Sequence, residues 1–152
     1  MSAPLAALSG LAWVYEQIET RLLAMPAPTP KLIDRIDPLN ANPEHIAHMG
    51  IAVEIPSTEN RGEYRDDDYA LAHDTVSVSL TYRIRPHEQR NSRREAIQLE
   101  ERIRAWLVAG SWMRDMRLSY VGTPTRSPHP KSSEFYLIVQ TFRTARDAAL
   151  GD

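Results

Sequence analysis

The chain has 152 residues, of which 42% are hydrophobic, and a formal net charge of −2 at pH 7. This length suits a single domain, residues 1–152, that buries a core, and the absence of cysteine excludes disulfide bridges, thiolate metal sites and a cysteine nucleophile. Because 18 basic side chains are offset by 20 acidic ones, no overall field holds a nucleic-acid backbone, and any contact with DNA must be local.

The N-terminal segment predicts a helix followed by a stiff connector. Its longest apolar stretch, 3–15, is too short and too interrupted to cross a membrane, and no basic segment precedes it, so we expect cytoplasmic synthesis without export. Apolar residues recur at spacings of three and four, at Leu8, Leu11, Tyr15, Ile18 and Leu22. Such spacings place them on one stripe of a helix. Met25-Pro26 ends this helix, and Pro28 and Pro30 keep the following connector extended.

Four later segments alternate between apolar and polar residues, which is the pattern of β-strands. They are 51–55, 75–85, 116–120 and 135–143. Pro56 is expected to end the first of them, and residues 31–37 are a further candidate, a short edge strand. A second amphipathic helix lies between the second and third strands, with Asn91 or Ser92 as its N-cap and Gly110 as its C-cap.

This order of elements, αββαββ, predicts an α+β fold: a mainly antiparallel sheet of about four strands with two helices packed on one face. The last strand has apolar side chains on both faces, Phe135, Leu137 and Val139 on one and Tyr136, Ile138 and Phe142 on the other. Two helices cover only one face of such a sheet, so the second face needs a third layer or another subunit. Strand 75–85, roughly 36 Å long, also outreaches a second helix of roughly 25 Å. Its overhang would reach a neighbour or bend around its own core.

Two polar connections are candidates for contacts with other molecules. Residues 57–74 are long for an ordered loop and contain Arg61, Arg65 and the acidic run Asp66, Asp67 and Asp68. Residues 122–134 are rich in Pro, Ser and Thr and contain Arg126, His129 and Lys131, with no acidic residue before Glu134. The second connection is the better candidate for touching DNA or an acidic partner.

Motifs for catalysis, nucleotide binding and metal binding are absent from the sequence. The densest set of possible metal ligands, Asp66, Asp67, Asp68, His73 and Asp74, matches no known spacing, so a solvated acidic loop is the stronger interpretation. His45 and His48 lack a third ligand. The densest basic region contains Arg83, Arg85, Arg90, Arg93 and Arg94, but Glu88, Glu95, Glu100 and Glu101 interleave with it and are expected to neutralise much of its field. We therefore expect no cofactor, no metal and no enzymatic activity.

In its order of elements the chain resembles the tail terminator and minor tail proteins of long-tailed phages and prophages. The segments that carry the resemblance are the helix ending at Leu22-Leu23, strand 51–55, the long strand through 85, helix 93–108 and the closing hairpin through 135–142. The resemblance implies a structural virion protein, usually a hexameric ring, that caps the tail tube, ends its polymerisation and joins the tail to the head connector. It also implies assembly in the host cytoplasm and a final location at the tail-neck junction, with the tube protein and a connector or neck protein as partners.

On this interpretation, subunit or connector contacts fall on Arg61, Arg65, Asp66, Asp67, Asp68, Arg83, Arg85, Tyr136, Ile138 and Phe142. Contacts with the tube, its lumen or DNA fall on Arg126, His129 and Lys131. Within the same class, a head-closure or tail-completion protein is an alternative. A second alternative is a ferredoxin-like nucleic-acid-binding module, which shares the αββαββ order and would stack bases on Tyr136 and Phe142. A small enzyme that uses His73 with Asp66, Asp67 or Asp68 is the last alternative.

Overall fold

The computed structural model describes residues 10–33, 46–61, 69–109 and 116–149. Within them lie two helices, α2 (Leu11–Leu23) and α3 (Gln89–Val108). The strands are β1 (Lys31–Leu32), β2 (Gly50–Arg61), β3 (Tyr69–Arg83), β4 (Met116–Tyr120), β5 (Thr125–His129) and β6 (Ser132–Ala149). The described helices include none that is long and apolar enough to cross a membrane.

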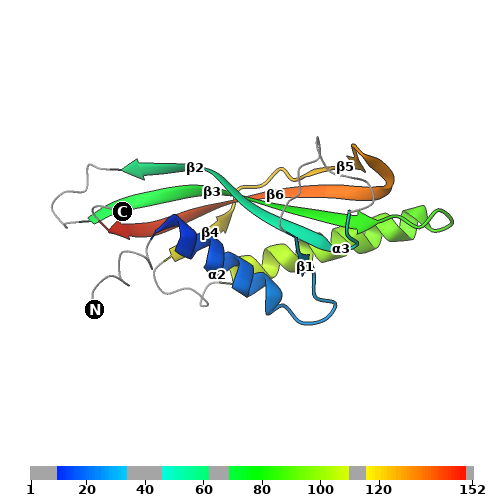
Figure 1. Cartoon of the computed structure of the whole chain (residues 1–152), viewed down its shortest axis with the longest axis horizontal. Coiled ribbons are helices and arrows are strands. Elements are labelled where there is room, and N and C mark those ends of the chain that lie inside the picture. Colours follow the sequence, from blue (N-terminus) through cyan, green and yellow to red (C-terminus); the bar gives the residue numbers. More distant parts are fainter. Residues whose placement is uncertain (1–9, 34–45, 62–68, 110–115, 150–152) are drawn as a thin grey trace.

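These strands form one twisted, six-stranded mixed sheet (Figure 1). The strand order is β1-β2-β3-β6-β4, and β5 pairs with the part of β6 that β4 leaves open. β1 runs parallel to β2, whereas the other pairs are antiparallel. The predicted sheet of about four mainly antiparallel strands is therefore wrong. β1 has only two residues and the first four residues of β5 are exposed, so neither gives the alternating pattern by which a strand is recognised in a sequence.

β2 does not end at Pro56, as the sequence predicted. The register between β2 and β3 shifts between Glu54 and Ser57, so Pro56 lies in a bulge, where the ladder does not require its missing N–H. β2 then continues to Arg61, and β3 already begins at Tyr69. The predicted loop 57–74 is therefore mostly a β-hairpin, and only residues 62–68 of it lie outside the described part of the chain.

The three strands β2, β3 and β6 give the molecule its elongated form. They contain 12, 15 and 18 residues, and they run side by side along the longest axis in Figure 1. β3 is about 50 Å long, while the 20-residue α3 spans about 30 Å. The prediction that the long strand outreaches its helix is confirmed, because the β2–β3 hairpin extends past the helices at one end of the sheet (Figure 1).

Both helices pack on one face of the sheet (Figure 1). α2 buries Val14, Ile18 and Leu22, and α3 buries Ala96, Leu99, Ile103 and Leu107. They meet alternate residues of four strands, including Ile51, Val53, Val76, Val78, Leu80, Leu118, Ile138 and Phe142. Leu11, expected on the buried stripe, is 38% exposed, and Val14 takes its place, while the Tyr15 hydroxyl accepts a hydrogen bond from the Ile55 N–H at 2.8 Å.

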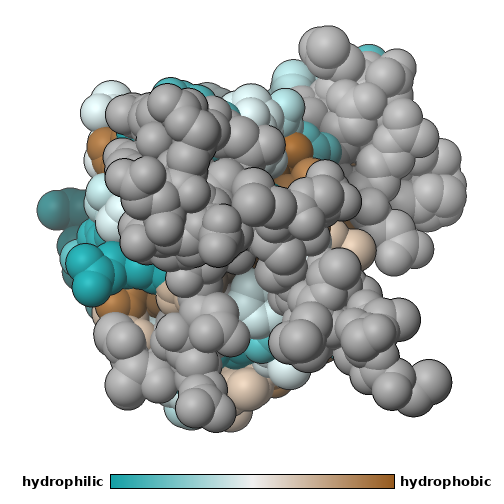
Figure 2. All heavy atoms as spheres, turned by 90° about the vertical axis from the view of Figure 1, so that its left-hand side faces the viewer, coloured by the Kyte–Doolittle hydropathy of each residue, from teal (hydrophilic) through white to brown (hydrophobic). Residues whose placement is uncertain are grey.

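The opposite face of the sheet buries its large apolar residues without a helix from the described part of the chain. Phe135 is 3% exposed and Leu137 is 7% exposed. Leu137 packs with Ala52, and the partly buried Ile33 and Val139 complete this small second cluster. The expectation that a third layer or another subunit must cover this face does not hold for Phe135 and Leu137, because this chain already buries them. Seen from the hairpin end, the described residues that are visible include both hydrophilic and hydrophobic ones (Figure 2).

Candidate functional site

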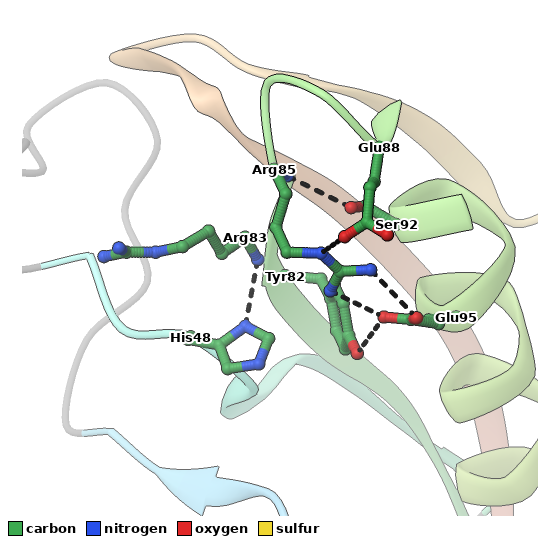
Figure 3. Close-up of polar contacts among 7 residues, drawn as sticks. All are labelled: His48, Tyr82, Arg83, Arg85, Glu88, Ser92 and Glu95. Carbon is green, nitrogen blue, oxygen red and sulfur yellow. Dashed lines mark hydrogen bonds and ion pairs between the residues drawn. The ribbon is translucent and has the colours of Figure 1, made fainter. Parts of the chain in front are cut away.

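The turn between β3 and α3 contains a cluster of charged side chains that includes the predicted contact residue Arg85 (Figure 3). The Arg85 guanidinium donates from Nε to Glu88 at 2.7 Å, and its two terminal nitrogens donate to the two carboxylate oxygens of Glu95, each at 3.0 Å. These charge-assisted bonds raise the pKa of Arg85, and they lower the pKa of Glu95. Arg85 therefore already has two acidic partners within its own chain.

Tyr82 and His48 complete this cluster (Figure 3). The Tyr82 hydroxyl donates to Glu95 at 3.1 Å, and the edge of the His48 ring meets the Tyr82 ring with centroids 4.5 Å apart. The Nδ1 atom of His48 accepts the N–H of Arg83 at 3.1 Å, so the neutral ring carries its proton on Nε2. Burial, followed by the nearby Arg83 and Arg85, lowers the pKa of His48. The stability that this neutral histidine supplies is present above its ordinary pKa and is lost as pH falls below it.

Arg83, the other arginine predicted at this site, is exposed. Its guanidinium lies 5.3 Å from the centroid of the Phe135 ring, on the sheet face opposite the helices. Arg83 and Arg85 are thus close in sequence but differ in whether their guanidinium groups can contact another molecule. Arg83 is presented to solvent, whereas Arg85 holds the start of α3 to the end of β3 through Glu88 and Glu95.

α3 begins at Gln89, earlier than the predicted N-cap at Asn91 or Ser92. Ser92 is instead buried in the first turns of the helix, where its hydroxyl accepts the Arg85 N–H at 3.0 Å. The actual N-cap, Glu88, makes no capping side-chain bond, because its carboxylate binds Arg85. No local signal marks this start in the sequence, since the residues just before Gln89 include no Ser, Thr, Asp or Asn.

The predicted neutralisation of the basic region by interleaved glutamates holds for Arg85 but not for the three arginines in the first turns of α3. Arg85 binds Glu88 and Glu95, and Glu100 is fully buried, where it binds Arg126 and Arg104. The side chains of Arg90, Arg93 and Arg94 are exposed, and none of them forms an ion pair with a described residue. Sequence spacing placed these acids near Arg90, Arg93 and Arg94, but in the folded chain Glu88 and Glu95 meet Arg85, and Glu100 meets Arg126 and Arg104.

Arg126 does not lie in a polar loop, as predicted, but in strand β5. Its guanidinium donates two hydrogen bonds of 2.7 Å to the Glu100 carboxylate, one from Nε to Oε1 and one from a terminal nitrogen to Oε2. The bonds to Glu100 raise the pKa of Arg126. Arg126 therefore links the outer strand β5 to α3. Its guanidinium is already paired with Glu100 within the single chain.

We expect Arg126→Ala to lower the free energy of unfolding by about 1–2 kcal/mol, because the buried Glu100 carboxylate would keep only the longer 3.4 Å contact with Arg104. Arg126→Lys is the matched control, since it keeps the charge but loses the fork and should recover only part of the loss. Urea denaturation measures both variants. Unchanged stability together with weaker DNA binding would instead support the predicted role of Arg126 in contacting DNA.

His129 and Lys131 lie at the β5–β6 turn. His129 is only 4% exposed, its Nδ1 atom accepts the Lys131 N–H at 3.0 Å, and burial lowers its pKa. The Lys131 side chain is exposed. Of the three residues predicted to contact the tube, its lumen or DNA, Lys131 alone is exposed and has no charged partner among the described residues.

Tyr136, Ile138 and Phe142 lie on the face of β6 that the helices cover. Ile138 and Phe142 are fully buried, and Tyr136 packs partly buried against the same core. Phe142 lies opposite Val76, and Ile138 lies opposite Leu80. The prediction that Ile138 and Phe142 contact another subunit is therefore inconsistent with the folded chain. Tyr136 and Phe142 also cannot form a base-stacking platform on the open face of the sheet.

Of the residues named as possible metal ligands in the acidic loop, only His73 and Asp74 lie in the described part of the chain, and both have partners there. Asp74 is buried and binds Arg146 at 2.8 Å, while Nδ1–H of His73 donates to the Thr144 carbonyl at 3.0 Å. Arg65, Asp66, Asp67 and Asp68 lie outside the described residues, as does His45, and the Arg61 backbone ends β2. Across the described ranges, no three His, Asp or Glu side chains gather in a way that could hold a metal ion.

A cleft of about 310 Å³ lies where the start of α3 meets the β5–β6 hairpin. It is lined by Ile84, Pro86, Gln89, Arg93, Pro128, Ser133, Glu134, Phe135 and Tyr136. The sequence could not reveal this cleft, because its walls come from segments more than 30 residues apart. Its apolar floor and the charged Arg93 suit a peptide side chain beside an acidic group.

Comparison with known proteins matched no protein-family model and no curated protein. The resemblance to phage tail proteins therefore stays a prediction. What supports a function is the geometry of the chain: an elongated sheet, a projecting hairpin at one end, and exposed arginines with a cleft at the other.

Proposed function

We propose that the chain is a structural subunit of a phage tail. In this proposal, copies of it close into a ring, usually of six, that caps the tail tube, ends tube polymerisation and joins the tail to the head connector. The observation that carries the proposal is the difference between the two ends of the elongated sheet. Unlike ends allow a subunit to contact its neighbours head to tail, and such contacts form a ring when the rotation between subunits closes.

One end consists of the β2–β3 hairpin together with the end of β6. The register pairs Arg61 with Leu71 and Tyr69 with Ala149, so the three strands stay paired up to this end. β1 pairs only with Gly50 and Ile51, and beyond them the outer edge of β2 has no strand partner among the described residues. The bulge at Pro56 and the exposed polar side chains of this edge oppose indiscriminate strand pairing. This end is thus extended and chemically suited to a specific contact.

The other end consists of the start of α3 and the β5–β6 hairpin. Arg83 lies opposite Phe135 in the sheet there, and α3 begins six residues after Arg83. This end carries the exposed arginines and the cleft of about 310 Å³. A basic, indented end and a projecting hairpin end differ in shape and in chemistry, which favours a heterologous contact over a symmetric dimer.

A head-closure or tail-completion protein would use the same kind of ring, so this alternative differs only in the proteins bound on either side. The nucleic-acid-binding module has less support. Its proposed stacking residues, Tyr136 and Phe142, face the helices, and the open face of β3 has Ser77, Ser79 and Thr81 in its place.

Light scattering after size exclusion tests the ring directly. We expect a species near six times the 17.3 kDa of the chain, populated increasingly as concentration rises. Adding the chain to a polymerising tube protein from the same phage genome should then shorten the tubes and place the chain at one end. A head-closure protein would form a ring without affecting tube length. A strict monomer that binds single-stranded DNA would contradict the proposal and favour the nucleic-acid-binding module.

A further inference from the structure

The start of α3 carries a basic surface that the described part of the chain leaves without acidic partners. We call Arg90, Arg93 and Arg94 the arginine surface. All three side chains are exposed and have no ion pair with a described residue. Three of the nearby acids have other partners, because Glu88 and Glu95 bind Arg85 and Glu100 binds Arg126.

The placement of these arginines is unfavourable for an isolated helix. Arg90 lies three residues before Arg93 and four before Arg94, so like charges are neighbours on the helix surface. They also lie near the N-terminal end of the helix, where the backbone dipole is already positive. No acidic residue occupies the first turn, and Glu88 turns toward Arg85. An anionic partner would relieve this accumulation of positive charge.

The arginine surface is short, and acidic side chains lie at its borders. Arg90 and Arg94 are about 6 Å apart along the helix axis. Glu101, exposed on the same helix, lies beyond this surface, and Glu134 lines the cleft beside Arg93. A nucleic-acid backbone would meet these carboxylates as it continued past the arginines. A short acidic peptide of three or four charges fits better, with the cleft next to it for an apolar or aromatic side chain.

The chain itself contains such a peptide between β2 and β3. Residues 62–68 have the sequence GEYRDDD, with four acidic residues, one of them Glu63 and three of them the consecutive Asp66, Asp67 and Asp68. This segment joins Arg61 to Tyr69 at the hairpin end of the sheet. β3 spans about 40 Å from Leu71 to Arg83, next to the start of α3. A seven-residue connection, at most about 25 Å when fully extended, cannot reach the arginine surface of its own chain.

We propose that the arginine surface binds Asp66, Asp67 and Asp68 of a second copy of this chain. Each copy then offers its acidic hairpin end to one neighbour and its arginine surface to the other. The contact is heterologous and repeats from copy to copy. It deepens the proposed ring function, on which it rests, by naming the two surfaces that meet between neighbours.

Charge reversal on each side tests this contact. The arginine variant is Arg90→Glu, Arg93→Glu and Arg94→Glu, and the aspartate variant is Asp66→Lys, Asp67→Lys and Asp68→Lys. Self-association is measured by sedimentation and light scattering at about 50 mM salt, where screening is weak. We expect each variant alone to associate about 10- to 100-fold more weakly than the unaltered chain. An equimolar mixture should regain association, because each reversed surface then meets an opposite charge on the other variant.

Three controls separate a specific contact from misfolding, from a general change in net charge and from DNA binding. Glutamates in the first turns of α3 favour the helix dipole, so the arginine variant should keep its circular dichroism spectrum and melting temperature. The single variant Arg94→Glu is compared with Arg117→Glu, a matched reversal on the exposed side of β4 that should leave association unchanged. Single-stranded DNA is added to the unaltered chain as a competing partner.

The outcomes distinguish this contact from the proposed function. Loss of association in both variants with recovery in the mixture supports the contact. Normal association of either variant, no recovery in the mixture, or an unaltered chain that stays monomeric up to its solubility limit overturns it. DNA binding by the arginine surface without self-association would overturn it as well, by assigning that surface to nucleic acid. If the contact holds but the ring does not shorten tail tubes, the tail function fails while the contact stands.

Discussion

Replacement of Asp74 by alanine is expected to lower the free energy of unfolding by about 3–5 kcal/mol, the usual loss when one partner of a buried ion pair is removed. Asp74 is fully buried and Arg146 is 5% exposed. Arg146 donates from Nε to one carboxylate oxygen at 2.8 Å and from a terminal nitrogen to the other at 3.3 Å. Without Asp74, the guanidinium stays in a region that water scarcely reaches and loses both of these bonds.

The Asp74 carboxylate also joins three strands near the hairpin end of the sheet. Thr58 on β2 donates to it at 2.6 Å, and Thr144 on β6 donates at 2.7 Å. The Asp74 N–H in turn donates to the Thr144 hydroxyl at 2.8 Å. A one-residue slip of any of these strands would separate these partners, so we infer that the network fixes the register of this end.

Urea denaturation at pH 7 measures the effect, with two comparisons. Glu59→Ala removes an exposed ion pair with Arg143 at 3.6 Å and should cost less than about 1 kcal/mol. The double variant Asp74→Leu and Arg146→Met should recover much of the stability, because apolar residues of similar volume often replace a buried ion pair without loss. A loss in Asp74→Ala no larger than in Glu59→Ala would contradict the prediction.

The same carboxylate predicts how stability changes in acid. Burial raises the pKa of Asp74, but the hydrogen bonds from Arg146, Thr144 and Thr58 outweigh it, and the net pKa lies below its ordinary value. Unfolded Asp74 therefore binds a proton before folded Asp74 does. Its contribution to stability is present above the ordinary pKa of about 3.9 and is lost as pH falls through the lower folded pKa. Asp74→Ala should flatten this acid-side loss in unfolding measured from about pH 5 downward.

Phe142→Ala is expected to lower the free energy of unfolding by about 3–5 kcal/mol, through lost burial and the cavity left behind. Phe142 is among the largest side chains that are fully buried, and its ring meets the Tyr120 ring with centroids 5.5 Å apart. The measurement is denaturation at a concentration low enough to keep the chain monomeric. This prediction separates a core role from the subunit contact expected from the sequence.

Two controls make the Phe142 result specific. Phe142→Leu keeps most of the buried volume and should cost clearly less than Phe142→Ala. Val139→Ala changes the partly buried opposite face of the same strand and should cost about 1 kcal/mol or less. Unchanged stability of the Phe142→Ala monomer with weakened self-association would place Phe142 at an interface after all.

Some of the residues predicted from the sequence as contact residues do lie on the surface, whereas others are paired within their own chain. Arg83 and Lys131 are predicted as contact residues and are exposed. Arg85 and Arg126 are predicted as contacts too, but each is held by glutamates of its own chain. The arginine surface is basic in the sequence, yet the interleaved acids suggest that its charge is neutralised. Nothing in the sequence tells which of two neighbouring arginines a glutamate will meet.

Local periodicity was enough to locate most elements of the fold. Alternation located the centres of β2, β3, β4 and β6, and spacings of three and four located both helices, because these patterns follow from the geometry of the backbone. Which strands lie side by side and which charges meet depends instead on the packed chain. The Arg126–Glu100 and Arg146–Asp74 pairs join residues 26 and 72 positions apart, and β1 and β5 exist as strands only because a neighbour supplies their hydrogen bonds. Periodicity reports the face on which a side chain lies, whereas its partner on that face is set by the packing of distant segments.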